Sequence, residues 1–170
     1  SFHSNQLETL KAIFEEDSGP KPEWLFSWGK VTAEVFAINA GPSIFFASSD
    51  GLLVHFNGSF VESIEGLKVS PDKVLAISIT KTKVDSSEVF SFSGFAANFG
   101  DLYCEGPTEV SSQLALKTGI MPIIEISQKC FVDKQLGDQS ILLNESRQLV
   151  GLQFFLHPAN EPATVRYNPI

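Results

Sequence analysis

The sequence predicts a mainly β protein, an antiparallel meander that forms a sandwich or an open barrel, with one N-terminal α-helix. Two turn dipeptides separate three short apolar runs within residues 43–67. From Trp24 onward, apolar and polar residues alternate with the period of a strand. About ten strands, with turn signals roughly every 8 to 12 residues, are typical of a sandwich or barrel.

The N-terminal segment has the only clear helical pattern. Ser4 or Asn5 is a suitable N-cap, and apolar residues then follow at helical spacing: Leu7, Leu10, Ile13 and Phe14. A helix is therefore expected over residues 4–17. The residues that end it are Gly19, Pro20 and Pro22, since proline removes a backbone donor. We expect a single β-rich domain over 1–170, of which 1–22 form the helix and a linker.

Strands begin after this linker. Trp24, Phe26 and Trp28 fall on one face of an alternating segment, and Gly41-Pro42 ends the long arm that follows. Asp50-Gly51 and Asn57-Gly58 are the dipeptides that supply positive φ in two-residue hairpin loops, and both have apolar flanks.

The rest of the chain also alternates, after a turn at Ser70-Pro71-Asp72. In residues 74–84, apolar residues alternate with Ser, Thr or Lys, which places one face of the strand in the core and the other in water. Further strands are expected at 88–95, 101–105, 108–116, 122–133, 139–144, 148–157 and 163–167. The last of these, close to several prolines, is expected at a sheet edge.

Composition limits the classes of function. With 170 residues, 43% of them apolar and 15 of them Phe, the chain can build one sizeable core. A formal charge of -8 repels phosphate backbones, so nucleic acid is not an expected partner. The sequence has no run of 18 apolar residues, so it predicts no membrane-spanning helix.

Cys104 and Cys130 are the only cysteines, and neither lies in a CxxC motif or at a His-paired spacing. This pattern does not favour a zinc site. One disulfide in an oxidising compartment and two buried free thiols are both compatible with the count.

No catalytic constellation stands out, so the chain is expected not to be an enzyme and to need no cofactor. Residues 136–140 have a passing likeness to the nucleophile strand of trypsin-like proteases, but Gln139 stands where the serine would be. His3, His55 and His157 form no HxH or HxxxH pattern, so no metal site is expected.

Four aromatic residues are candidates for stacking on sugar rings: Trp24, Trp28, Tyr103 and Tyr167. An aromatic face suits the apolar face of a pyranose. Core packing is the stronger expectation for Trp24 and Trp28, because they share a strand face with Phe26.

The order of short motifs resembles that of the YjbF/GfcB group of bacterial capsule and exopolysaccharide lipoproteins. The residues that carry the resemblance are Asp50 to Gly58, Ser63 to Leu67, Phe90 to Gly94, Tyr103-Cys104, Phe131 to Asp133, and Phe154 to Pro158. In that group a short polar N-terminus leads into a helix, then strands, then a hairpin with Asn-Gly or Asp-Gly.

The resemblance implies a non-enzymatic periplasmic lipoprotein held at the outer membrane and assisting capsule or exopolysaccharide assembly or export. The implied partners are export or assembly proteins, or a glycan. Membrane contact would be through a lipidated cysteine immediately before Ser1. An oxidising periplasm would favour a Cys104 to Cys130 bridge.

Two other functions fit the same residues. A Phe-rich antiparallel barrel can enclose an apolar cavity and bind a small apolar ligand or lipid. An uncharacterised hydrolase using His55 or His157 is the other alternative.

Overall fold

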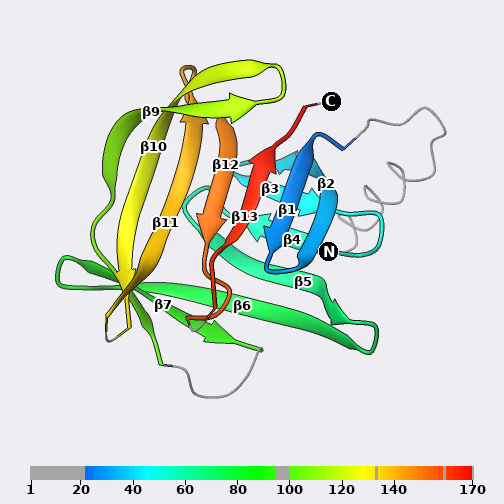
Figure 1. The fold of residues 1–170 in the computed structure, drawn as a ribbon. Coiled ribbons are helices and arrows are strands. Elements are labelled where there is room, and N and C mark those ends of the chain that lie inside the picture. The colour runs from blue at the N-terminus through cyan, green and yellow to red at the C-terminus, as the bar shows by residue number, and fades with distance from the viewer. Residues whose placement is uncertain (1–21, 95–99, 133, 159, 170) are drawn as a thin grey trace.

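The structure, a computed structural model, describes residues 22–94, 100–132, 134–158 and 160–169. Within these ranges the chain forms thirteen strands joined by turns (Figure 1). The strands are β1 (Trp24–Trp28), β2 (Val31–Ala40), β3 (Ser43–Ala47), β4 (Leu53–Phe56), β5 (Val61–Ser70), β6 (Lys73–Val84), β7 (Ser87–Ser93), β8 (Leu102–Cys104), β9 (Thr108–Leu116), β10 (Gly119–Phe131), β11 (Gln135–Asn144), β12 (Leu149–Phe154) and β13 (Ala163–Tyr167).

The strands form one antiparallel sheet in which nearly every strand lies beside its neighbour in sequence. The order is β11-β12-β13-β1-β2-β3-β4-β5-β6-β7-β8-β10-β9, and β10 also pairs with β11. This arrangement confirms the predicted antiparallel meander. It also places the two ends of the described chain side by side, because β13 pairs with β1.

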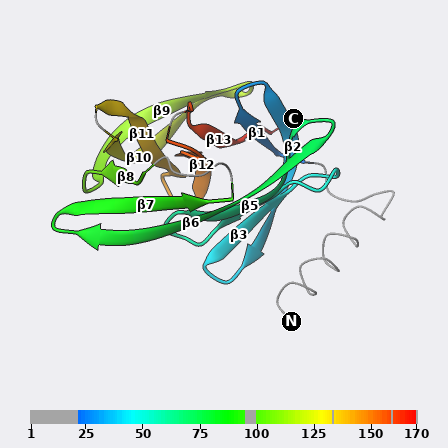
Figure 2. The ribbon, with the colours of Figure 1, turned by 90° about the horizontal axis from the view of Figure 1, so that it is seen from below.

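The sheet curls round like an open barrel because β10 has partners on both edges. Its residues 123–127 pair with β11 on one edge and with β9 on the other. Cys130 and Phe131 pair with β8 on the edge that β9 also uses. In Figure 2, β5, β6 and β7 form one wall of the barrel, and β10, β11 and β12 lie across from them.

Strand alternation creates the core, as the sequence predicts. In β6, Leu75, Ile77 and Ile79 are buried while the residues between them are exposed. The largest fully buried side chains include Phe26, Phe46, Phe155, Ile64 and Leu67. Each such side chain contributes roughly 1.5 to 3 kcal/mol of burial free energy, so the Phe-rich interior holds the curled sheet together.

The two turn dipeptides keep their positive φ but not their predicted loop length. Gly51 has φ 104° and Gly58 has φ 98°, yet the connections are residues 48–52 and 57–60. The expectation of two-residue loops is therefore wrong. The Asn57 side chain explains the second case, because its Oδ1 accepts hydrogen bonds from the backbone N–H groups of Ser59 and Phe60, 2.9 Å each.

Two strand expectations need correction. The segment 163–167 is not at an edge, since β13 lies between β12 and β1. Its prolines at 162 and 169 flank the strand and do not interrupt its ladders. The strand expected at 148–157 ends at Phe154, and Phe155, Leu156 and His157 are buried beyond it.

The helix expected over 4–17, and most of the linker, lie outside the described residues. Among the residues that the structure describes, no helix has the length and apolar character needed to cross a bilayer.

Candidate functional site

A cavity of about 320 Å³ lies between the two walls of the barrel. Its apolar lining combines aromatic and aliphatic side chains, among them Phe56, Phe60, Phe90, Ile126, Ile141 and Phe154. Its polar lining includes Ser59, Lys81, Glu88, Gln128, Gln139 and Gln153. The space is at the lower end of the size of ordinary small-molecule sites.

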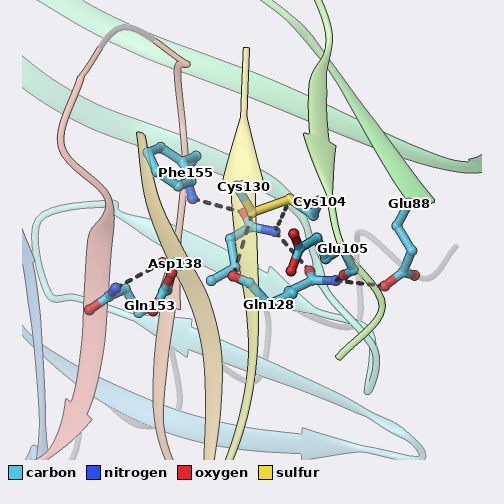
Figure 3. The surroundings of a disulfide bond; sticks show 9 residues. Glu88, Cys104, Glu105, Gln128, Cys130, Asp138, Gln153 and Phe155 are labelled. Carbon is cyan, nitrogen blue, oxygen red and sulfur yellow. Dashed lines mark hydrogen bonds between the residues drawn. A yellow bond between two sulfur atoms is a disulfide. The ribbon is translucent and has the colours of Figure 1, made fainter. Parts of the chain in front are cut away.

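Strand register explains how the cavity wall becomes polar along β10 and β11. Ile126 lies opposite Ile141, and two residues further along Gln128 lies opposite Gln139. Side chains of opposed residues point to the same face, and residues two apart share it. Cys130 follows two residues after Gln128, so the disulfide lies next to the amide part of the wall (Figure 3).

The glutamines form a hydrogen-bonded network that joins separate strands. Gln139 Nε2 donates to Gln128 Oε1 at 3.3 Å, and Gln139 Oε1 accepts from the backbone N–H of Phe155 at 3.0 Å (Figure 3). Gln128 Nε2 donates to Glu88 Oε1 at 2.8 Å and to the Glu105 carbonyl at 3.0 Å. The network therefore connects β7, β10, β11 and the segment after β12.

A charged pair lies at the same cavity. Lys81 Nζ is 3.0 Å from Glu88 Oε2, and the side chains are 27% and 15% exposed. Lys81 also donates to Ser59 Oγ at 2.7 Å and lies 5.1 Å from the centroid of the Phe60 ring. The site thus combines an aromatic surface with a cation, a carboxylate and amides, a set of groups suited to a ligand with both apolar and polar parts.

Cys104 and Cys130 are joined by a disulfide and are buried. They are direct register partners in β8 and β10, with Cα atoms 4.1 Å apart (Figure 3). The backbone N–H of Glu105 donates to the Lys129 carbonyl at 2.9 Å beside them. Of the two arrangements compatible with the sequence, the structure has the bridge.

The four aromatic residues proposed for glycan stacking do not gather at one place. Trp24 packs edge-on against Phe46 and Tyr167, with ring centroids 5.0 and 5.6 Å apart. Trp28 is buried, and its Nε1 donates to the Glu161 carbonyl at 3.1 Å. Tyr103 is 45% exposed on β8, and β10, β11 and β12 lie between β8 and β13 around the barrel. Stacking of sugars on these residues stays a prediction.

His55 belongs to a polar chain across β3, β4 and β5. Its Nδ1 is 3.0 Å from Glu62 Oε1, and its Nε2 is 3.0 Å from Ser43 Oγ. A carboxylate only accepts, so Nδ1 carries a proton, and the Nε2 of a neutral ring accepts from the Ser43 hydroxyl. Asn57 Nδ2 donates to Glu62 Oε2 at 3.1 Å and orients the carboxylate.

This order of contacts is the one found in serine hydrolases, but the surroundings do not complete such a site. The His55 ring stacks on Phe45, with centroids 4.3 Å apart. Ser43, His55 and Glu62 line neither the cavity described above nor two other cavities of the described residues, one beside Thr32 and Ser70 and one beside Trp28 and Lys73. We interpret the chain of contacts as one that fixes three neighbouring strands to each other.

His157 is buried just after β12, and its carbonyl accepts a hydrogen bond from the Asn160 N–H at 3.2 Å. Burial lowers the pKa of His157 below its usual value of 6.5, because the charged imidazolium is desolvated. His3 lies outside the described residues. Among those that are described, no group of three His, Cys, Asp or Glu side chains is placed to hold a metal ion.

Comparison with known proteins identifies the fold. The chain superimposes on the crystal structure of the hypothetical lipoprotein YmcC from Escherichia coli (K12), with a TM-score of 0.59 over 97% of both chains. The two sequences are 9% identical, so the likeness establishes a shared fold. No protein-family model and no curated protein sequence matches the chain. The solved structure is described as a lipoprotein, the same kind of protein as the group that the sequence resembles.

The glutamines were not recognised as functional candidates from the sequence. One signal pointed to them: in the expected strand 122–133, Gln128 lies two residues from Cys130 and shares its face. A polar residue on a core face that also carries a cysteine indicates a hydrogen-bonded position. Its partner Gln139 could only be found once the register of β10 and β11 was known.

Proposed function

We propose that this chain is a non-enzymatic lipoprotein of the periplasm, anchored at the outer membrane, that assists capsule or exopolysaccharide assembly or export. The observation that carries the proposal is the fold shared with a hypothetical lipoprotein over 97% of both chains. The order of motifs that resembles the capsule lipoprotein group supports the same class of protein.

The disulfide adds independent support for the compartment. Disulfides persist in the oxidising periplasm and are rare in the bacterial cytoplasm. Here the bridge is buried and joins two strands, which is the arrangement of a structural disulfide. An acidic surface is also suited to a protein without nucleic-acid partners.

The anchor is tested by intact mass spectrometry of the natural protein from membrane fractions of its own host. We expect the mass of a diacylated or triacylated N-terminal cysteine. The matched control is a variant in which that cysteine is replaced by serine, which should move to the soluble periplasmic fraction. An unmodified chain in the cytoplasm would refute both the anchor and the compartment.

The role in polysaccharide export is tested separately, by deleting the gene and measuring surface polysaccharide. We expect less polysaccharide outside the cell, restored by the natural gene. A lipidated protein whose deletion leaves exported polysaccharide unchanged would keep the anchor and refute the role. Pull-down with export proteins, or binding to the purified polysaccharide, would then separate the two kinds of partner.

The cavity supports a second candidate, a barrel that binds a small apolar ligand or lipid. Its volume of about 320 Å³ and its Phe-rich wall are the supporting observations. Native mass spectrometry of the purified protein would then find a bound lipid. Ile126→Trp fills the cavity and should abolish binding, whereas Ile120→Trp, at a position 71% exposed, should not. A natural protein that never carries or takes up a lipid would remove this candidate.

A further inference from the structure

We propose that β9 is a self-association edge, through which two copies of this chain pair their β9 strands antiparallel about a two-fold axis at Ser112. The inference does not depend on the proposed function. It starts from the position of β9 at the end of the sheet order, where β10 is its only partner among the strands that the structure describes. A strand with one partner leaves alternate N–H and C=O groups along its other edge unpaired.

This edge is long and regular. β9 runs from Thr108 to Leu116, and its pairing with β10 continues from Thr108 opposite Ser127 to Leu116 opposite Gly119 without a register shift. Six consecutive residues, 108–113, are exposed. Figure 1 shows the β9–β10 hairpin at the upper margin of the molecule, away from the β5–β6 side.

β9 has few of the usual protections of an edge strand. Proteins guard such edges with lysine, proline or a bulge. β9 contains neither lysine nor proline, and no bulge interrupts its register. Glu109 is its only charge, and Arg147 lies 3.0 Å from it.

Charge also favours a second copy at this place. The whole chain carries a formal charge of -8, so two copies repel each other over most of their surface. Residues 108–122 contain one acidic and one basic residue, Glu109 and Lys117. The hairpin is therefore locally neutral, and Val110 and Ile120 are 50% and 71% exposed on it.

Pairing about Ser112 is self-complementary. Ser112 is the midpoint of β9, so this register opposes all nine residues of both strands. It places Val110 opposite Leu114 and Ser111 opposite Gln113 of the second copy. Glu109 then lies opposite Ala115, and the two Glu109 carboxylates are separated along the strands by roughly 20 Å.

The test is sedimentation velocity with multi-angle light scattering of the full chain over a concentration series. We expect a reversible shift toward twice the 18.6 kDa monomer mass as the concentration rises. The Ser111→Lys, Gln113→Lys double variant places lysines opposite each other at two points, and like charges directly opposed destabilise a ladder. It should remain monomeric. The matched variant Ser111→Lys, Gln113→Glu opposes lysine to glutamate and should dimerise again.

Cysteine crosslinking gives a second readout. Both natural cysteines are in the disulfide, so Ser112→Cys introduces a single free thiol that lies beside its copy on the two-fold axis. Mild oxidation should link this variant into dimers faster than Ser111→Cys. A chain that stays monomeric at every concentration would overturn the proposal. So would a dimer that survives the two lysines, or one that lysine and glutamate do not restore.

Discussion

Cys104 and Cys130 lie directly opposite each other in β8 and β10, and their disulfide is located where the curled sheet closes. β8 has only three residues, yet it links the β7 side of the barrel to β10. Gln128 reaches across the same junction to Glu88 with a 2.8 Å hydrogen bond. The short pairing of β8 with β10 is thus reinforced by a disulfide and by a side-chain hydrogen bond from Gln128.

Removing the disulfide should weaken this closure. A bridge between residues 26 apart restricts the unfolded chain by about 3.5 kcal/mol in the loop-entropy treatment. We expect the Cys104→Ala, Cys130→Ala variant to lose free energy of unfolding of that order in urea titrations. Hydrogen exchange should accelerate first in β8. Dithiothreitol should destabilise the natural protein and leave the double variant unchanged; an equal effect on both would contradict this account.

Gly66 should not tolerate a side chain. It has φ 70°, and a Cβ there would lie 2.1 Å from the Gly51 carbonyl oxygen. We expect Gly66→Ala to lower the free energy of unfolding by at least about 2 kcal/mol, from backbone strain and displacement of residues 48–52. Gly29→Ala is the control, because Gly29 has a similar φ of 57° but nothing within 4 Å. If both variants lose a similar free energy of unfolding, the close approach of the new Cβ to the Gly51 carbonyl oxygen is not the cause.

Replacing Gln139 should lower the free energy of unfolding more than replacing an exposed glutamine does. Gln139→Leu leaves the Phe155 backbone N–H and the side-chain oxygen Gln128 Oε1 without their present partner, at a cost of about 1 to 3 kcal/mol. Gln148→Leu, at an exposed position bonded to Asn144, should change stability by less than about 0.5 kcal/mol. Urea denaturation of both variants measures the difference. Equal effects would argue against a structural role for the network.

The buried His157 predicts a pH dependence of stability. Its pKa is lowered in the folded protein, so as pH falls below 6.5 the unfolded chain binds a proton that the folded chain excludes. The free energy of unfolding should therefore decrease from pH 6.5 down to the lowered pKa and lose nothing further from this group below it. His157→Asn should remove this part of the slope. If the free energies of unfolding of the natural protein and His157→Asn differ by the same amount across that pH range, the prediction is refuted.

The Ser43, His55 and Glu62 contacts should not support hydrolysis. We expect a fluorophosphonate probe to leave the folded protein unlabelled, since these residues do not line the cavities described above and the His55 ring stacks on Phe45. His55→Ala should instead loosen β3, β4 and β5, seen as faster hydrogen exchange there. Labelling that disappears in Ser43→Ala would support the hydrolase alternative.

Local sequence patterns predict the β class, the meander and the buried face of most strands. These properties depend on local alternation and turn residues, as in β6 and at Gly51 and Gly58, and such signals lie within a few residues of each other. The order of short motifs supports the proposed lipoprotein class by resemblance. Sequence alone does not separate glycan-stacking residues from core residues, because an aromatic residue on a strand has the same pattern whether it faces core or solvent.

The closure of the barrel, the cavity and the free edge of β9 depend on contacts between segments far apart in the sequence. Pairing of β8 with β10, the opposition of Gln128 and Gln139, and the isolation of β9 depend on which distant strands come together. The residues that flank β13 suggested an edge, yet burial against β12 and β1 placed it inside the sheet. Register between segments far apart in sequence is set by packing of the whole interior, and no local pattern contains it.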